Sequence, residues 1–257
     1  MGKTFLLLVA LAFASQDIVT INQQSDFITS DALGNLYCID NTQILKYNSE
    51  GEKSGYYSNS QWGNITSADA SDPLRILVFY EDFNRILFLN KQLAEIGNSI
   101  DLYQFSSNET KLVCSSAQGG FWLYDSEEDQ ALHISANGQI IVRSILLGSL
   151  LNETEPTIMR EKGELLYLLL PGKGLLVLTQ LGHYRQMLHI PGIESFQIDK
   201  DGITYLKKNK CFRFTPDSQT DPQLYPGINF QGKQLRIESG ILFFGDNQKI
   251  NLQTVNN

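Results

Sequence analysis

Six similar strand-rich units follow one another along this 257-residue chain, and this internal repeat restricts the fold more than any other feature. Each unit contains a short apolar run after a polar turn that usually includes glycine. The runs begin at residues 34, 74, 111, 164, 202 and 240, with spacings of 40, 37, 53, 38 and 38 residues. Repeats of about 40 residues are typical of propellers and solenoids.

The same order of strands returns within each unit. A short strand precedes the turn at residues 27–30, 64–67, 104–107, 195–198 and 234–237. After the apolar run, a second turn leads to a third strand at residues 43–47, 85–89, 121–124, 174–178, 211–214 and 249–252, and most units add a fourth. Four short strands in about 40 residues, without a convincing amphipathic helix, form a β-propeller blade. We therefore predict an all-β, six-bladed β-propeller.

The two ends of the chain predict how the ring closes. The last unit supplies three strands and then ends, whereas residues 17–22 (DIVTIN) form a strand before the first unit with no other place to pair. We expect the N-terminal strand to pair into the last blade, because closure removes an exposed sheet edge.

The predicted units lie within one domain, residues 15–257. Their limits are near residues 25–60, 61–101, 102–154, 155–192, 193–230 and 231–257, the last completed by 17–22. The long spacing of 53 residues places extra chain at residues 140–156, and either an extended outer strand or a loop flap would account for it.

Composition and the N-terminus bear on location. The chain is 42% hydrophobic and 19% charged, and its net charge of −8 argues against nucleic-acid binding. Lys3, the apolar run 5–13 and small residues at 12–14 predict a signal peptide over residues 1–14, although a buried first strand would also fit. No other run is long enough to span a membrane. We expect an exported protein, periplasmic or extracellular.

Cysteine and histidine give little indication of chemistry. Cys38, Cys114 and Cys211 are an odd number with no metal-ligand spacing, so we interpret them as buried thiols. We expect His133 in an outer strand of the third unit, with His183 and His189 flanking one outer strand, far from the axis. The G-x-S-x-G motif of serine hydrolases is absent from the sequence.

The first unit resembles a known repeat family. Gly34-Asn35-Leu36-Tyr37, Asp40-Asn41, Ile44, Lys46-Tyr47 and Gly51 are similar to the NHL-type propeller repeat, and the other units keep its rhythm. The chain as a whole is similar to secreted six-bladed propellers of bacteria. This resemblance implies an architecture, and propellers serve binding, scaffolding and catalysis alike.

A cation site is one hypothesis for the channel. Sugar-lactone hydrolases with this architecture hold a divalent cation with Glu, Asn and Asp side chains at the channel entrance. The corresponding positions here, at the start of each innermost strand, are Asp26, Gly63, Tyr103, Glu155, Glu194 and Lys233. Three acids, Asp26, Glu155 and Glu194, would suit calcium. The alternative is a solvated rim without a cofactor.

A binding surface is the second hypothesis. Loops entering each blade, and loops between second and third strands, emerge on one face of a propeller. They contain aromatic and charged residues of the kind that interfaces use: Trp62, Glu81, Asp82, Phe83, Arg85, Lys173, Tyr225 and Asp246. We expect a non-catalytic scaffold that binds a protein, or else a glycan or peptide. The alternative is a propeller hydrolase or lyase with a cation in its channel.

Overall fold

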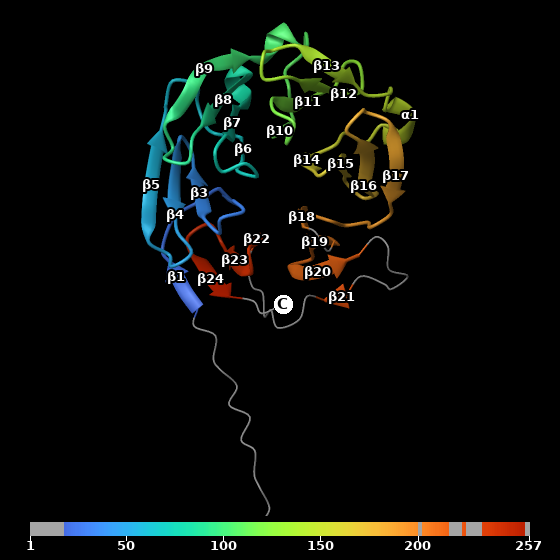
Figure 1. Ribbon diagram of the computed structural model, residues 1–257. Helices are drawn as coiled ribbons and strands as arrows, with labels where there is room; N and C mark the ends of the chain where they lie inside the picture. The colour runs from blue at the N-terminus through green and yellow to red at the C-terminus, as the bar shows by residue number, and fades with distance from the viewer. Residues whose placement is uncertain (1–17, 200–201, 216–222, 225–232, 255–257) are drawn as a thin grey trace, which may run out of the picture.

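The computed structural model is a ring of six four-stranded antiparallel sheets around a central axis (Figure 1). It describes residues 18–199, 202–215, 223–224 and 233–254; the predicted signal peptide and Tyr225 lie outside these ranges. The predicted fold class, an all-β six-bladed propeller, is confirmed. None of the helices in these ranges is long and apolar enough to cross a membrane.

The first three blades follow one another from the N-terminal side, each built from the innermost strand outwards. Blade 1 contains β2 (Phe27–Ser30), β3 (Leu36–Asp40), β4 (Gln43–Tyr47) and β5 (Lys53–Ser58). Blade 2 contains β6 (Ser67–Asp69), β7 (Ile76–Tyr80), β8 (Arg85–Leu89) and β9 (Glu95–Asp101). Blade 3 contains β10 (Val113–Ser115), β11 (Phe121–Asp125), β12 (Gln130–Ile134) and β13 (Ile140–Arg143).

The remaining blades repeat this arrangement. Blade 4 contains β14 (Ile158–Lys162), β15 (Leu165–Leu170), β16 (Gly174–Thr179) and β17 (Tyr184–Leu188). Blade 5 contains β18 (Ser195–Asp199), β19 (Gly202–Lys207), β20 (Lys210–Phe214) and β21 (Gln223–Leu224). Blade 6 contains β22 (Gln234–Glu238), β23 (Ile241–Gly245), β24 (Ile250–Thr254) and the N-terminal β1 (Ile18–Ile21). Three short helices lie in loops: η1 (Glu81–Phe83), η2 (Leu102–Gln104) and α1 (Gly148–Leu151).

The ring closes through β1, as predicted. This strand pairs antiparallel with β24, from Ile18 opposite Gln253 to Ile21 opposite Ile250, and so supplies the outermost strand of blade 6. The turn after β4 packs on it: a Cβ atom at Gly51 would lie 2.6 Å from Val19 Cγ1, and its φ of +80° also favours glycine. The first and last strands of the described chain are therefore neighbours in one sheet.

The core lies between the blades. Six apolar clusters separate successive sheets, and each combines side chains from two neighbouring blades. The middle strands are buried on both faces, which is why β7 reads ILVFY and β15 reads LLYLLL without polar alternation. All three cysteines are buried free thiols, as expected.

The predicted positions of two innermost strands are wrong. In blade 2 the innermost strand is β6, which lies later in the chain than the predicted strand at residues 64–67. In blade 3 it is β10, which lies later than the predicted strand at residues 104–107, and residues 102–104 form η2. Residues 111–114, predicted as a second strand, instead end in the first two residues of this innermost strand. The second strands begin at residues 36, 76, 121, 165, 202 and 241, so the true spacings are 40, 45, 44, 37 and 39.

This shift changes the interpretation of residues 140–156. They contain β13, the ordinary fourth strand of blade 3, and then the single-turn helix α1. His133 consequently lies in β12, a third strand, and not in an outer strand as predicted. Its ring is buried and stacks on Trp122 with centroids 4.7 Å apart.

Candidate functional site

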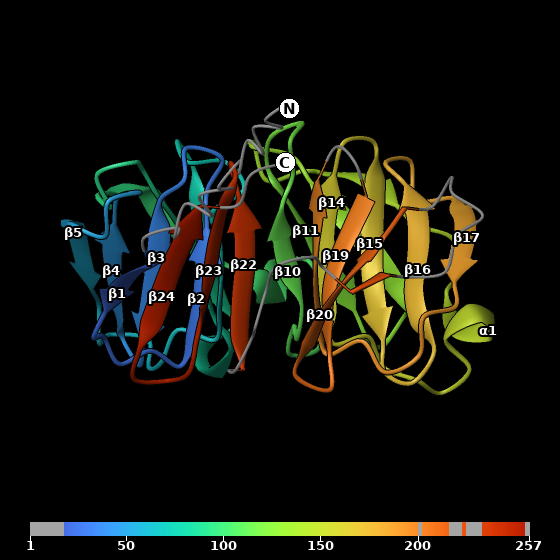
Figure 2. The ribbon, with the colours of Figure 1, turned by 90° about the horizontal axis from the view of Figure 1, so that it is seen from below.

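The strand order gives the ring two distinct faces. Adjacent strands are antiparallel, so the loops that lead into innermost strands lie on the same face of the ring as the loops that join second and third strands. We call this the start face; the end face is the opposite one, where the innermost strands finish. Figure 2 shows the ring from the side, with the strands running between these faces.

The three predicted cation ligands do not form a group. Asp26 Oδ2 accepts a hydrogen bond from Asn41 N at 2.8 Å, and Glu194 Oε1 accepts one from Lys208 N at 2.7 Å. In both blades the carboxylate therefore holds a turn residue of positive φ. Glu155 is exposed. Within the described ranges, no three or more His, Cys, Asp and Glu side chains are arranged to hold a metal ion.

Of the other three positions predicted at the start of innermost strands, two need correction. Gly63 lies in the loop before β6, and Tyr103 lies in η2, ten residues before β10 begins, because the innermost strands of these blades start later than predicted. Lys233 does directly precede β22, where its N–H donates to Gly245 O.

Five of the predicted partner-binding residues come together on the start face of blade 2. The strand β7 ends in η1, which contains Glu81, Asp82 and Phe83, and Asn84 closes this turn in the left-handed region with a φ of 49°. The buried Asn84 accepts hydrogen bonds from Leu102 N at 2.9 Å and from Thr110 N at 3.0 Å. These bonds fix η1 against η2 and against the loop into blade 3.

Two aromatic side chains are exposed beside this turn. Phe83 is 51% exposed and Tyr103 is 52% exposed. Phe83 directly precedes Asn84, and Tyr103 directly follows Leu102, so the hydrogen bond from Leu102 N to Asn84 O lies between them. Trp62 is partly buried and meets the ring of Tyr80 edge to face, with centroids 5.5 Å apart. We name Trp62, Asp82, Phe83 and Tyr103 the blade-2 patch.

Close packing and ion pairs hold the surroundings of this patch. A Cβ atom at Gly63 would lie 3.1 Å from Asp82 Oδ2, so the loop containing Trp62 rests directly on η1. Glu81 pairs with Lys111 at 2.8 Å, and Arg85 pairs with Asp101 at 3.1 Å. The patch is thus a small aromatic surface with charged side chains around it.

The remaining predicted partner residues have local roles. Lys173 donates to the carbonyls of Leu151 and Asn152, which attaches the end of α1 to blade 4. Asp246 accepts hydrogen bonds from Gln248 N and Lys249 N and closes the turn between β23 and β24. The structure therefore does not bring these two residues to the blade-2 patch.

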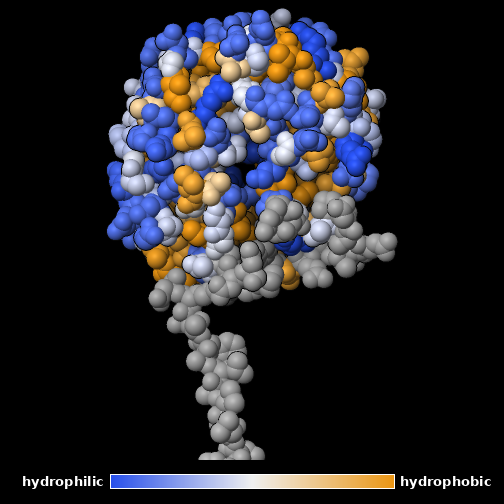
Figure 3. Space-filling view, viewed as in Figure 1, coloured by the Kyte–Doolittle hydropathy of each residue, from blue (hydrophilic) through white to orange (hydrophobic). Residues whose placement is uncertain are grey.

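The central channel contains a polar arrangement that the sequence analysis missed. The third residue of every innermost strand is polar, and we call these six residues the channel ring: Thr29, Asp69, Ser115, Arg160, Gln197 and Arg236. All but Ser115 line a cavity of about 80 Å³, together with residues that follow them toward the end face. In the space-filling view, hydrophilic side chains surround a hollow near the centre of the ring (Figure 3).

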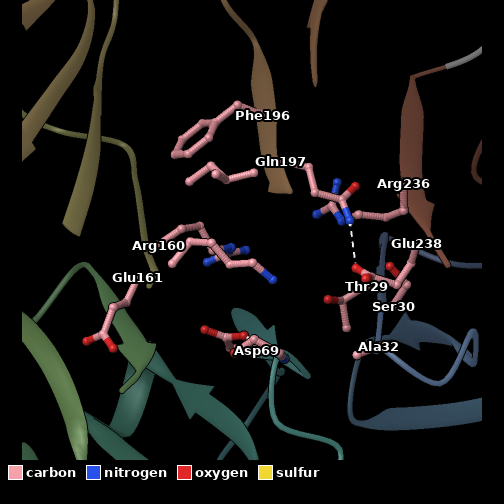
Figure 4. Close-up of a pocket in the computed structure, with 13 residues that line it drawn as sticks. Thr29, Ser30, Ala32, Asp69, Arg160, Glu161, Phe196, Gln197, Arg236 and Glu238 are labelled. Atoms are coloured by element: carbon pink, nitrogen blue, oxygen red, sulfur yellow. Dashed lines mark hydrogen bonds between the residues drawn. The ribbon is translucent and has the colours of Figure 1, made fainter. Parts of the chain in front are cut away.

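Two members of the channel ring connect neighbouring blades. Asp69 Oδ2 accepts a hydrogen bond from Ser115 N at 3.0 Å, while Gln197 accepts from Ile237 N at 2.8 Å and donates to Ile237 O at 2.6 Å. Gln197 also donates to Glu238 Oε2, the bond dashed in Figure 4. These bonds tie blade 2 to blade 3 and blade 5 to blade 6.

The two arginines extend into the cavity instead. Figure 4 shows Arg160 and Arg236 reaching from different strands toward the centre, with Asp69 nearby. The pKa of Arg236 is lowered to about 10, chiefly by burial and in addition by the neighbouring Arg160 guanidinium, while the Asp69 carboxylate acts in the opposite direction. In sequence, the only signal for this site was a polar residue two positions into each innermost strand, and it could be recognised only with the correct strand register.

Comparison with known proteins establishes the fold. No protein-family model and no curated protein sequence matches the chain. Among solved structures, virginiamycin B lyase from Staphylococcus aureus is similar with a TM-score of 0.66 and 12% identity over 93% of this chain and 99% of that one. A streptogramin B lyase gives 0.65 and 13% identity over 93% and 98%. The WD40 domain of Neurospora crassa Pan2 gives 0.64 and 9% identity over 91% and 90%. At such low identity, the shared property is the β-propeller fold.

Proposed function

We propose that this chain is an exported, non-catalytic β-propeller that binds a protein partner through the blade-2 patch and acts as a scaffold in the cell envelope. The observation that supports this proposal is the pair of half-exposed aromatic rings, Phe83 and Tyr103, on a turn that buried Asn84 holds in place. Aromatic anchors within a polar rim are typical of protein interfaces.

The rigidity of the patch favours binding. Asn84 fixes the backbone on both sides of the two rings, and the Gly63 loop packs against η1. The backbone of the patch is already ordered, so docking of a partner would cost little backbone conformational entropy. The ion pairs of Glu81 with Lys111 and of Arg85 with Asp101 supply charges that would select among partners.

The test compares the patch with an exposed apolar residue elsewhere. We would immobilise the mature protein, the double variant F83A/Y103A and the control L181A, since Leu181 is 61% exposed in the turn between β16 and β17. Each would be incubated with envelope extract and the captured proteins quantified by mass spectrometry. A partner retained by wild type and L181A, lost with the double variant, and then bound as a purified protein would support the proposal.

The same experiment can overturn it. Capture that survives the double substitution, or that L181A reduces equally, would show that the blade-2 patch is not the docking site. Metal analysis of the mature protein, with thermal unfolding in EDTA and in excess calcium, tests the proposal that the protein is not an enzyme. A stoichiometric cation whose removal lowers the melting temperature would instead favour a hydrolase or lyase. N-terminal sequencing of protein recovered outside the cytoplasm should begin near residue 15 if the export proposal holds.

A further inference from the structure

We propose that the end-face half of the central channel is a binding site for a small oxyanion, a carboxylate or phosphate group, held by Arg160 and Arg236. Both side chains line the cavity, and they come from blades 4 and 6. This site is separate from the blade-2 patch and does not depend on the proposed protein partner.

The guanidinium groups retain most of their hydrogen-bonding capacity. Arg160 Nη1 donates to Met159 O at 2.9 Å, and Arg236 Nη1 donates to Leu235 O at 2.8 Å. Each is thus held by the carbonyl of the preceding residue in its own strand. A guanidinium has five N–H donors in a planar fork that matches the oxygens of carboxylate and phosphate. Among the described residues, no other hydrogen-bond acceptor satisfies the remaining donors of either arginine.

Three carboxylates, Asp69, Glu161 and Glu238, also line the cavity, and each accepts hydrogen bonds from groups other than the two arginines. Neither arginine forms an ion pair with a carboxylate of the described residues. Asp69 is occupied by Ser71 N and Ser115 N, and Glu161 accepts from Ala117 N and from the indole N–H of Trp122. Two like charges that meet in a partly desolvated channel repel each other, and an anion between them would relieve that repulsion.

A second observation indicates a ligand at the same place. Ser30 lines the cavity, its residue is 7% exposed, and its hydroxyl oxygen is buried without a hydrogen-bond partner in the protein. A buried hydroxyl without a partner is costly, so such groups in native structures usually meet water or a ligand.

The size of the cavity limits the ligand. Its volume of about 80 Å³ is several times the roughly 10–15 Å³ that a cavity needs to hold one water molecule. That space suits an inorganic phosphate or a short dicarboxylate, whereas a nucleotide would not fit inside it. Phe196 and Ile198 contribute apolar wall, which lowers the local dielectric and strengthens the charge interaction.

The test measures anion binding directly. Mature protein in a chloride buffer free of phosphate and carboxylates would be titrated with inorganic phosphate and, separately, with succinate in a calorimeter. We expect one site per chain. Because a hydrogen bond to a charged group contributes about 1.5–3 kcal/mol, R160Q and R236Q should each weaken binding about tenfold or more. R236K, which keeps the charge without the planar fork, should fall between wild type and R236Q.

The control variant removes an arginine elsewhere. Arg143 is exposed on β13, so R143Q lowers the net charge equally and should bind like wild type. Binding of phosphate alone would identify a tetrahedral oxyanion, and binding of succinate alone a carboxylate; either supports the site if R160Q and R236Q each weaken it about tenfold or more. Failure of both probes to bind at up to about 10 mM, or binding that the two variants keep, would overturn the proposal. Circular dichroism of each variant checks that it remains folded.

Discussion

Replacing Arg236 with methionine should stabilise the anion-free protein. The side chain lies in the channel beside the Arg160 guanidinium, and burial together with that like charge lowers its pKa to about 10. A lowered pKa on a base means that the folded state disfavours the charged form. Methionine is unbranched and uncharged, so R236M removes this penalty while replacing the aliphatic part of the arginine side chain.

The magnitude follows from the pKa change. The lowering of this pKa from the ordinary arginine value to about 10 corresponds to about 3 kcal/mol of unfavourable free energy at pH 7. Water in the channel screens part of this, and losing the hydrogen bond to Leu235 O costs about 1 kcal/mol. We therefore expect R236M to raise the free energy of unfolding by about 1–2 kcal/mol, in line with other replacements of buried charges by apolar groups.

The pH dependence supplies an independent check of sign. Below pH 10 the folded and unfolded states both hold the Arg236 proton, and the full penalty applies. As pH rises from about 10 toward the ordinary pKa of arginine, the folded state releases that proton first. This group then makes stability increase with pH. The contribution of Arg236 over that window should be absent from R236M.

The assay is urea unfolding at pH 7 in chloride buffer, followed by fluorescence, with R143M as the control for loss of an exposed arginine. The control should stay within about 0.5 kcal/mol of wild type. A fall of more than about 1 kcal/mol in R236M, with an unchanged denaturant slope, would refute the reasoning, because Arg236 would then be holding the fold together. Added oxyanion should reverse the order of stability, since only wild type gains free energy by binding it.

Three further predictions concern closure, contact between blades and the thiols. A chain that begins at residue 22 lacks β1 and leaves the edge of β24 unpaired, so its free energy of unfolding should fall by about 3 kcal/mol or more. Calorimetry measures this loss, and an unchanged melting temperature would show that closure does not depend on β1. E161A removes the acceptor of both Trp122 Nε1 and Ala117 N and should cost about 2–4 kcal/mol in urea unfolding, whereas the exposed-site control E164A should cost almost nothing; equal losses would contradict this role for Glu161. Burial raises the pKa of all three thiols, so none should react with a disulfide reagent at pH 8 until denaturant is added, and rapid labelling of the native protein would refute their burial: Cys38, Cys114 and Cys211.

Some parts of this fold could be predicted because their cause is local. The second strands are buried between two blades, so β7 and β15 are continuous apolar runs that the sequence displays directly. Closure was also predictable, because pairing the isolated N-terminal strand with the three-stranded last unit removes the unpaired edge of that unit. The predicted protein-binding residues at Glu81–Phe83 lie beside such a run, which is why their position on blade 2 was recognised.

The innermost strands could not be located in the same way, and the channel ring was missed with them. Two of these strands, β6 (SAD) and β10 (VCS), have only three residues each, which is too short for a strand pattern to be recognised in the sequence. Their polar residues belong to no local motif, because their partners come from other blades more than forty residues away, as Asp69 and Ser115 show. Arg160 and Arg236 become neighbours only after the ring has closed. The strand that closes the ring therefore also creates the channel site, and a variant without β1 should lose oxyanion binding along with stability even though β1 supplies no residue to the cavity.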